Sequence, residues 1–135
     1  MPKVPAHLVE GRGFGVMHDE LLWCEVLITP PSVNHYWIRG ANKTNRLSKR
    51  AIHFIDVMKR FIEPAGYQGR VRVKIEYAPP DAKIHDIDNI VKPCFDALSK
   101  GGLILDDSQV DELLVKRLPS EKGGKLIIQV EKLKV

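Results

Sequence analysis

The sequence predicts a single small domain of the α/β or α+β class, with a mixed β-sheet and two helices. Three observations lead to this prediction. The chain has 135 residues, which suffices for one domain with its own hydrophobic core. Two segments place apolar residues at helical spacing, and four have the β-branched content or the alternation that is typical of strands. The expected order is strand, helix, strand, helix, strand, strand, with no internal repeat and no linker that would divide a domain.

The first strand is expected over residues 21–29, which are rich in apolar, β-branched and aromatic residues. Pro30 and Pro31 end it, because proline cannot donate to a strand ladder. Residues 1–20 contain prolines and glycines without a sustained period, so we expect an N-terminal extension outside the core and a folded domain over residues 21–135. Residues 33–46 are expected to form a long loop that is polar, aromatic and basic together.

Ser48 is the expected N-cap of the first helix, which ends by Pro64 and Gly66. The apolar residues that recur at helical spacing along it are Ala51, Ile52, Ile55, Met58 and Ile62. Residues 70–77 then alternate apolar and charged side chains, which predicts a strand with one face in water.

The second helix is expected over residues 89–99 and ends at Gly101 and Gly102. Pro93 falls in its first turn, where a missing N–H costs little. The helix is expected to bury Ile90, Val91, Cys94, Phe95 and Leu98. Residues 110–118 and 125–133 are expected to be strands joined as a hairpin through residues 119–124.

Composition favours a soluble cytoplasmic protein. The hydrophobic fraction is 44%, and the net charge of +4 permits a polyanionic partner without requiring one. Cys24 and Cys94 belong to no CxxC motif or Cys/His cluster, so two buried, reduced thiols are expected. The N-terminus lacks the apolar run of a signal peptide, and no segment approaches the ~20 apolar residues of a membrane span.

The segment from His85 to Lys92, followed by the segment from Leu105 to Gln109, carries the candidate chemistry. Asp86 and Asp88 are two apart and would share one side of an extended segment. Asp88 would then open a helix and place Lys92 one turn above it. A second pair, Asp106 and Asp107, could return to the first pair after that helix. Converging carboxylates beside a lysine suit a hard divalent cation at a phosphodiester, since magnesium prefers oxygen ligands.

Each of these features also has an ordinary structural interpretation. An isolated Asp-x-Asp is commonly a helix N-cap with its neighbour, because Asp accepts hydrogen bonds from free helix N–H groups. An Asp-Asp pair is commonly a turn, and Lys92 alone would be a solvated helix residue. Asp96 is one turn from Lys92, so a structural ion pair is its simplest interpretation. His85 would point away from Asp86 in a strand and is not expected to be a ligand.

Several spaced motifs together resemble the RusA family of Holliday junction resolvases. They are the run from Asp86 to Lys92 (DIDNIVK), the run from Phe95 to Leu98 (FDAL), and the run from Leu105 to Val110 (LDDSQV). Pro30-Pro-Ser-Val-Asn34 with Tyr36, Lys116, and Lys122-Gly-Gly124 agree as well. The similarity extends from about residue 22 to the C-terminus. Members of the family often have a dense arginine run before the first Asp, where this chain has only Asp81-Ala-Lys83-Ile-His85.

The resemblance implies a magnesium-dependent endonuclease, with manganese as a substitute, that resolves four-way DNA junctions by paired nicks during recombination and repair. It implies metal-ligand and catalytic roles for Asp86, Asp88 and Asp107, and a catalytic role for Lys92. Asp106 is expected to support the site or cap its turn, and Asn89 belongs to the same Asp-x-Asp-Asn core. Two opposed cuts at a two-fold junction further imply a homodimer. No small-molecule cofactor and no membrane partner are expected.

The basic and aromatic loop is the candidate DNA-binding segment, since phosphate contacts and base stacking need these residue types. Its candidate contacts are Asn34, Tyr36, Trp37, Arg39, Lys43, Arg46, Lys49 and Arg50. Lys83, Lys116 and Lys122 complete the set of candidate DNA contacts, and Arg70, Arg72 and Lys74 could extend the basic surface. A loop whose aromatics only cap the core is the structural alternative.

Three alternatives for function stay open at this point. They are a nuclease of the same fold that acts on other branched DNA, a non-catalytic junction-binding protein with structural aspartates, and a metal-dependent phosphatase on small molecules. A pure binding protein gains nothing from bringing like charges together. A phosphatase would not explain the basic and aromatic loop.

Overall fold

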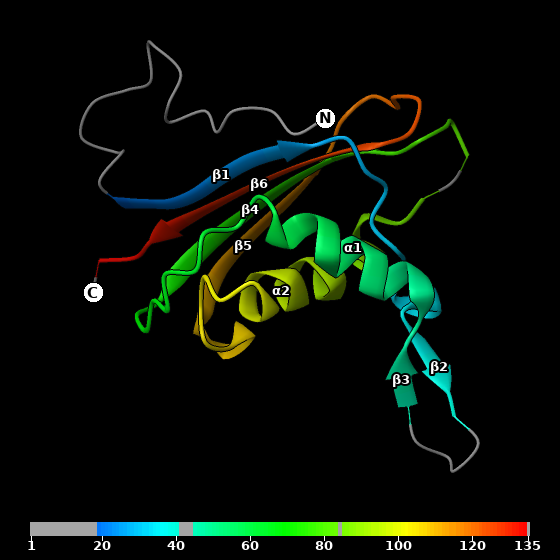
Figure 1. Ribbon diagram of the computed structural model, residues 1–135. Coiled ribbons are helices and arrows are strands. Elements are labelled where there is room, and N and C mark those ends of the chain that lie inside the picture. The colour runs from blue at the N-terminus through cyan, green and yellow to red at the C-terminus, as the bar shows by residue number, and fades with distance from the viewer. Residues whose placement is uncertain (1–18, 41–44, 84, 135) are drawn as a thin grey trace.

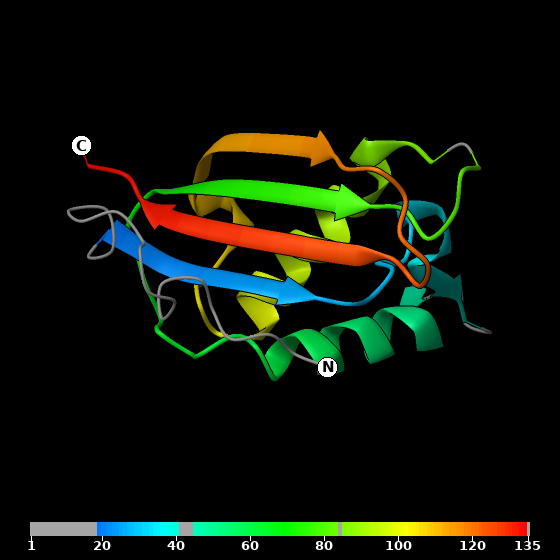
Figure 2. The same ribbon diagram turned by 90° about the horizontal axis from the view of Figure 1, so that it is seen from above.

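Four strands form one mixed sheet in the order β1-β6-β4-β5 (Figure 2). The computed structural model describes residues 19–40, 45–83 and 85–134. The strands are β1 (Glu20–Val26), β4 (Val71–Ala78), β5 (Val110–Arg117) and β6 (Lys125–Lys132). β4 is parallel to β5 and antiparallel to β6, and β1 is antiparallel to β6. The predicted α+β domain with a mixed sheet is therefore confirmed.

One face of the sheet is covered by both helices, α1 (Lys49–Lys59) and α2 (Val91–Lys100) (Figure 1). The alternation along β4 decides which side chains face them: Val71, Val73 and Ile75 are fully buried, whereas Arg72 is exposed. β6 follows the same rule, because Leu126, Ile128 and Val130 are buried and the residues between them are not. The core therefore lies between these strands and the two helices, as the alternating pattern predicts.

The predicted hairpin between β5 and β6 is wrong. β6 lies between β1 and β4, and β5 pairs with β4 at the outer edge of the sheet. The connection crosses the end of β4, where the backbone N–H of Leu118 donates to Tyr77 and that of Glu121 donates to Pro79. Burial explains the arrangement, because β6 is apolar on every second residue and needs a central position, whereas β5 is mostly exposed. Gly124 has a φ of +81° and closes the crossing beside β1.

The two helices match the sequence pattern with two differences. The Ser48 side chain caps α1 by accepting a hydrogen bond from the backbone N–H of Ala51, as predicted. Ile52 is one of the apolar residues at helical spacing, but it is 47% exposed and lies outside the core. α2 begins at Val91, because residues 87–90 form a separate 3₁₀ turn, and it ends at Gly101. Pro93 is buried within its first turn.

The predicted loop over residues 33–46 contains regular structure. A short 3₁₀ turn (Val33–His35) leads into β2 (Trp37–Arg39), which pairs antiparallel with β3 (Asn45–Leu47). This β2–β3 hairpin projects away from the sheet and helices (Figure 1). The expected contact Lys43 lies outside the described residues.

The first described residues belong to the fold, since β1 begins at Glu20. The predicted N-terminal extension otherwise lies outside the described residues. Cys24 and Cys94 are free and buried, as predicted, and burial raises the pKa of the Cys24 thiol to about 12. Among the described residues, no helix has the length and apolar character needed to span a membrane.

Candidate functional site

Asp86 and Asp88 lie in the segment that joins β4 to α2. Asp86 is extended, with φ −81° and ψ 127°, and it is the N-cap residue of the 3₁₀ turn Ile87–Ile90, which contains Asp88. The predicted extended segment carrying both carboxylates is therefore wrong, because the chain turns immediately after Asp86. Asp88 also does not open α2, whose N-cap is Ile90. Both carboxylates are exposed.

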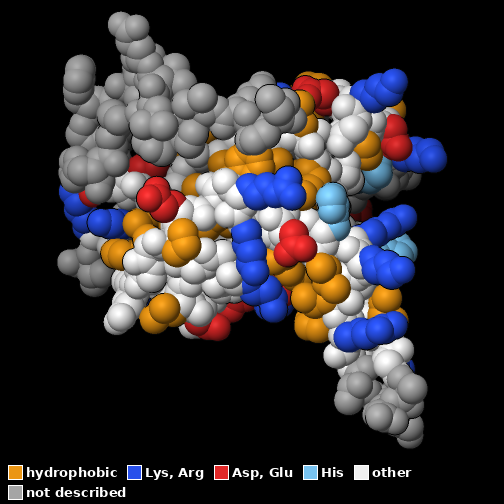
Figure 3. Space-filling view, viewed as in Figure 1, with side chains coloured by type: hydrophobic (Ala, Val, Ile, Leu, Met, Phe, Trp, Pro, Cys, Tyr) orange, Lys and Arg blue, Asp and Glu red, His pale blue; other side chains and the backbone are white. Residues whose placement is uncertain are grey.

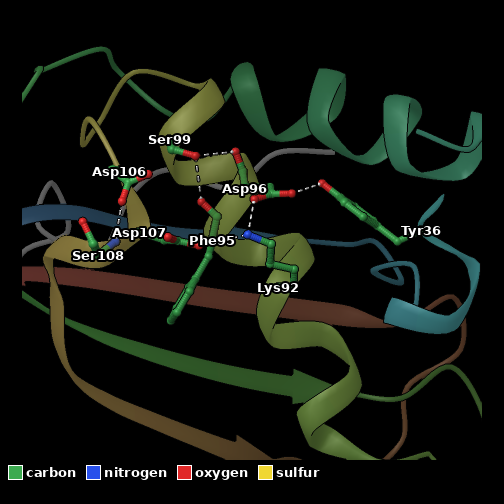
Figure 4. Close-up of polar contacts among 8 residues, drawn as sticks. All are labelled: Tyr36, Lys92, Phe95, Asp96, Ser99, Asp106, Asp107 and Ser108. Carbon is green, nitrogen blue, oxygen red and sulfur yellow. Dashed lines mark hydrogen bonds and ion pairs between the residues drawn. The ribbon is translucent and has the colours of Figure 1, made fainter. Parts of the chain in front are cut away.

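Lys92, in the first turn of α2, connects two further carboxylates (Figure 4). Its Nζ lies 3.0 Å from Asp107 Oδ2 and 3.1 Å from Asp96 Oδ1. The Asp96 contact is the predicted i, i+4 ion pair. The hydrogen bond to Asp107 is the largest of the causes that raise the pKa of Lys92 above its ordinary value. Lys92 is therefore a firmly protonated cation at neutral pH.

Tyr36 extends this group of charges into the core. Its side chain is fully buried, and its hydroxyl donates a hydrogen bond to Asp96 Oδ2 at 2.8 Å. Burial, with a smaller contribution from Asp96, raises the pKa of the Tyr36 hydroxyl, so it remains a donor. The Tyr36 ring packs in the core and is not accessible to DNA, so the prediction that Tyr36 contacts DNA is wrong.

Asp106 and Gln109 shape the turn that presents Asp107. The Asp106 side chain accepts a hydrogen bond from the Ser108 backbone N–H at 2.9 Å, and hydrogen bonds from Ser108 lower the pKa of the Asp106 carboxyl. The Gln109 amide N–H₂ donates to the carbonyls of Tyr67 and Gly69 at 2.7 and 2.8 Å. Gln109 Oε1 accepts from the backbone N–H groups of Leu105 and Asp106.

Sequence analysis missed Gln109, a buried polar residue that attaches this turn to the loop before β4. The available signal was the Asp-x-x-Gln spacing of Asp106 and Gln109, because together they form a capping box. The turn is the 3₁₀ element Asp107–Gln109, directly before β5. Asp107 is thus carried on a turn that is held at both ends.

The carboxylates of Asp86, Asp88 and Asp107 are the type of ligand that a hard cation prefers, but their side chains do not already form a coordination site. Within the described ranges, no three Asp, Glu, His or Cys side chains form a group that could hold a metal ion. The side chains of Asp86 and Asp88 have no hydrogen-bonding or ion-pair partner among the described residues, and Asp107 is bonded to Lys92 through Oδ2. Magnesium keeps several waters and commonly uses one or two protein carboxylates, so this exposed oxygen donor set fits it chemically.

A cavity of about 590 Å³ adjoins Asp86 and was not foreseen from the sequence. It lies between the segment after β1, helix α1, the end of β4 and the 3₁₀ turn before α2. Three histidines line it, of which His35 contacts Ser32 and His85 contacts Asp81 at 2.8 Å. Figure 3 shows His side chains among Lys and Arg side chains at the end of the molecule that carries the hairpin.

The other candidate DNA contacts are accessible. Trp37 is 47% exposed and meets the edge of the Tyr36 ring, with centroids 5.5 Å apart. The remaining exposed candidates are Asn34, Arg39, Arg46, Lys49, Arg50, Lys83, Lys116 and Lys122. Lys83 and Lys122 follow β4 and β5, which are parallel and end at the same end of the sheet (Figure 2). By contrast, Arg70 and Arg72 form ion pairs with Asp111 and Glu112, which weakens their case as part of the basic surface.

Comparison with known proteins gives a consistent result. The family model described as endodeoxyribonuclease RusA matches residues 28–131. The crossover junction endodeoxyribonuclease RusA of Shigella sonnei (strain Ss046) is 36% identical over 105 residues, which cover 75% of this chain and 87% of that protein. The protein of the same name from Escherichia coli (strain K12) has the same identity and coverage. The one from Enterobacteria phage 82 is 35% identical over 105 residues, with 75% and 87% covered.

Proposed function

The chain belongs to the RusA family of endodeoxyribonucleases, and from that premise we propose that it resolves four-way DNA junctions by paired, metal-dependent nicks. It is a crossover junction endodeoxyribonuclease, a hydrolase of phosphodiester bonds. The observation that carries the assignment to particular residues is the contact of Lys92 with Asp107, 3.0 Å long. It joins the motif from Asp86 to Lys92 to the motif from Leu105 to Val110, which are separate in the sequence and are two of the motifs on which the family resemblance rests.

Asp86, Asp88 and Asp107 are the proposed ligands of a magnesium ion, with manganese as a substitute. When bound, such an ion polarises a phosphate oxygen and lowers the pKa of a coordinated water. The support is chemical, because all three side chains offer carboxylate oxygens, and Asp86 and Asp88 are unpaired within the described part of the chain. Asp107 would be shared between the ion and Lys92.

Lys92 is proposed to neutralise the negative charge that develops on the phosphoryl oxygens during cleavage. Its raised pKa supports this role, since a permanently protonated ammonium serves as a charge partner and not as a base. Asp96 and the Tyr36 hydroxyl would hold the ammonium in place from behind. Asp106 would keep the turn of Asp107 capped, and Asn89 would support Asp88 as part of the 3₁₀ turn to which both belong.

The β2–β3 hairpin is the proposed principal DNA contact. Arg39 and Arg46 suit phosphates, and Trp37, which is 47% exposed, suits stacking on a base or sugar. Lys49 and Arg50 continue the positive surface at the start of α1. Lys83, Lys116 and Lys122 would extend it along the end of the sheet.

A homodimer is proposed because a four-way junction has two-fold symmetry and its resolution needs two opposed cuts. The outer strand β5 offers a contact for a second copy, since Leu113 and Leu114 are 44% and 54% exposed there. Exposed apolar residues on an outer strand favour pairing with another chain. The two buried, unpaired thiols support the further proposal that the protein works in the reducing cytoplasm.

Incubation of the purified protein with a synthetic four-way junction, a flapped duplex and a linear duplex tests this function. Each substrate is tested with magnesium and with EDTA. We expect symmetric nicks in the four-way junction and not in the other two substrates. These nicks should form in magnesium and not in EDTA. Equal cutting of the flap would favour a broader branched-DNA nuclease. Binding without cutting at every metal concentration would favour a junction-binding protein and contradict the catalytic assignment.

A further inference from the structure

Four of the polar side chains that line the cavity beside Asp86 have no partner. They belong to Arg50, His53, Asp86 and Asn89, and none of these side chains has a hydrogen-bonding or ion-pair partner among the described residues. Asn89 is half-buried, and its carboxamide can both donate and accept hydrogen bonds. These four side chains form no structural network with the described residues and are accessible to a ligand in the cavity.

Buried apolar residues form part of the walls of the same cavity. Pro30, Pro31, Phe54 and Ile90 are buried residues that line the same cavity. Its volume of about 590 Å³ lies in the ordinary range for small-molecule and cofactor sites. Apolar walls combined with polar groups suit a planar heterocycle, because such a ring has apolar faces and hydrogen-bonding edges.

Cationic or basic side chains line the cavity from α1, and a carboxamide lines it from the turn before α2. Arg50 and His53 are three residues apart on α1 and so project from one face of the helix, where both can donate to a phosphate. Asn89 approaches from the 3₁₀ turn before α2, and its amide can donate to and accept from the edge of a base. A nucleotide carries both groups, a phosphate and, through its sugar, a planar base with hydrogen-bonding edges.

We propose that this cavity receives one nucleotide of the cut strand, with its base withdrawn from the stack, next to the cleaved phosphate. The inference rests on the proposed function, because Asp86, a proposed metal ligand, lines the same cavity. Withdrawal costs stacking energy, and this cost is smallest where stacking is already interrupted, as at a branch point. The cavity would then select the base at the cut, in addition to the contacts of the hairpin.

Fluorescence of 2-aminopurine placed in turn at each position around the cut tests the proposal, because the fluorescence of this base rises when it leaves the stack. The Asp107→Asn protein is added to saturation in EDTA. We expect a rise of at least threefold at one position adjoining the cut and little change elsewhere. In the same background, His53→Trp, which puts a larger ring at the cavity, should reduce the rise to less than half. Ile52→Trp, an exposed site on the same helix that does not line the cavity, should leave it intact.

A matched pair of charge variants tests the phosphate side. Arg50→Ala should reduce the fluorescence rise at saturating protein, whereas Arg60→Ala, an exposed arginine at the end of α1, should not. No rise at any position, or a rise that survives both His53→Trp and Arg50→Ala, overturns the proposal.

The proposed function is tested separately by magnesium-dependent cutting of the same junction by the wild-type protein. If the junction is not bound at all, free deoxynucleoside 5′-monophosphates are titrated in EDTA and followed by NMR. Shifts of the Asn89 side-chain amide are then expected in the wild type and not in His53→Trp, and their absence in the wild type overturns the proposal.

Discussion

The Tyr36 hydroxyl donates a hydrogen bond of 2.8 Å to Asp96 across 60 positions of sequence. Asp96 in turn accepts from Lys92, and Lys92 contacts Asp107 (Figure 4). A buried aromatic residue ahead of the hairpin is thus connected through α2 to a proposed metal ligand. Removal of one hydroxyl group should therefore affect catalysis from within the core.

Tyr36→Phe removes only that hydroxyl. We expect the free energy of unfolding to fall by about 1–2 kcal/mol, since the partly buried Asp96 carboxylate loses a donor. Junction cleavage should slow because Lys92 is held less firmly, whereas junction affinity should stay the same. Urea unfolding, cleavage rates and gel-shift titrations measure the three quantities. Tyr67→Phe is the control, because the Tyr67 hydroxyl has no hydrogen-bonding partner in the described ranges. Equal loss of cleavage in both variants would contradict a positioning role for Tyr36.

Asp86→Asn, Asp88→Asn and Asp107→Asn should each reduce cleavage by more than about 100-fold, beyond the loss typical of residues that only support metal ligands. Junction affinity should be unchanged or higher, because each change removes a negative charge near the DNA phosphates. Asp106→Asn should cost about tenfold or less, since Asn caps a helical turn as well as Asp does. Single-turnover cleavage and gel shifts measure both effects. Normal cleavage by Asp88→Asn would show that Asp88 is not a metal ligand. An inactive Asp106→Asn would show that Asp106, and not Asp107, is the ligand of that pair.

Lys92 gives a prediction on pH. Its pKa is raised above the ordinary lysine value of about 10.5, chiefly by the hydrogen bond to Asp107. The contribution of the ammonium to folding is therefore complete below that value and is lost as the pH rises through the raised pKa. Between pH 7 and 9.5, cleavage should not fall through deprotonation of Lys92. NMR of ¹³C-labelled lysine should show a high pKa in the wild type and a lower one in Asp107→Asn. An unchanged Lys92 pKa in that variant would mean that the contact is absent in solution.

Patterns confined to one element were predicted well, and pairings between distant elements were not. The alternation of β4 and the Ser48 cap depend on neighbouring residues, so the sequence displays them directly. The Gly-rich connection before β6 has the local chemistry of a hairpin, but the burial of Leu126 and Val130 gives β6 a central position beside β4. Sequence spacing does not show whether β6 pairs with β5 in a hairpin or with β4 in the centre of the sheet. The burial that decides between these pairings exists only in the assembled sheet.

The candidate site shows the same division. The i, i+4 pair of Lys92 and Asp96 follows from helix geometry, whereas the contact of Lys92 with Asp107 depends on how the turn before β5 packs. Tyr36 belongs to a polar, basic segment, and nothing in its neighbours distinguishes a buried ring from an exposed one. The cavity beside Asp86 is likewise assembled from four separate segments. No motif could have indicated it.

Replacement of Arg39 and Arg46 with alanine should weaken junction binding and reduce the slope of log affinity against log salt by about two units, at roughly one per phosphate contact. Adding Lys43→Ala should bring the reduction to about two to three units. Fluorescence anisotropy over a range of salt concentrations measures the slope. Arg70→Ala with Arg72→Ala is the control, because Asp111 and Glu112 already pair these guanidinium groups. A slope that changes only in the control would show that DNA contacts the face of the sheet that carries Arg70 and Arg72, and not the hairpin.

The proposed dimer predicts a particular product when active and inactive subunits are mixed. Each subunit of a two-fold dimer would nick one strand, so a heterodimer of wild-type and Asp107→Asn subunits should nick only one strand of each bound junction. On a supercoiled plasmid with an extruded cruciform, one nick gives relaxed circles and two opposed cuts give linear DNA. The ratio of relaxed to linear product should therefore rise with the fraction of mutant subunits, because the mutant still binds.

A substitution on the exposed surface of β5 should change both the oligomeric state and the product of the same plasmid experiment. Leu114→Glu places a charge on an exposed residue of the outer strand, and light scattering should show a shift toward monomer. Ile52→Glu, at a comparably exposed position on α1, is the control for a general effect of added charge. The Leu114→Glu protein should produce relaxed circles even without mutant subunits, because two cuts on one junction then require two independent encounters. A wild-type protein that is monomeric at working concentrations, with activity that mixing merely dilutes, would exclude the dimer. In that case each cut is made by a single, independent active site.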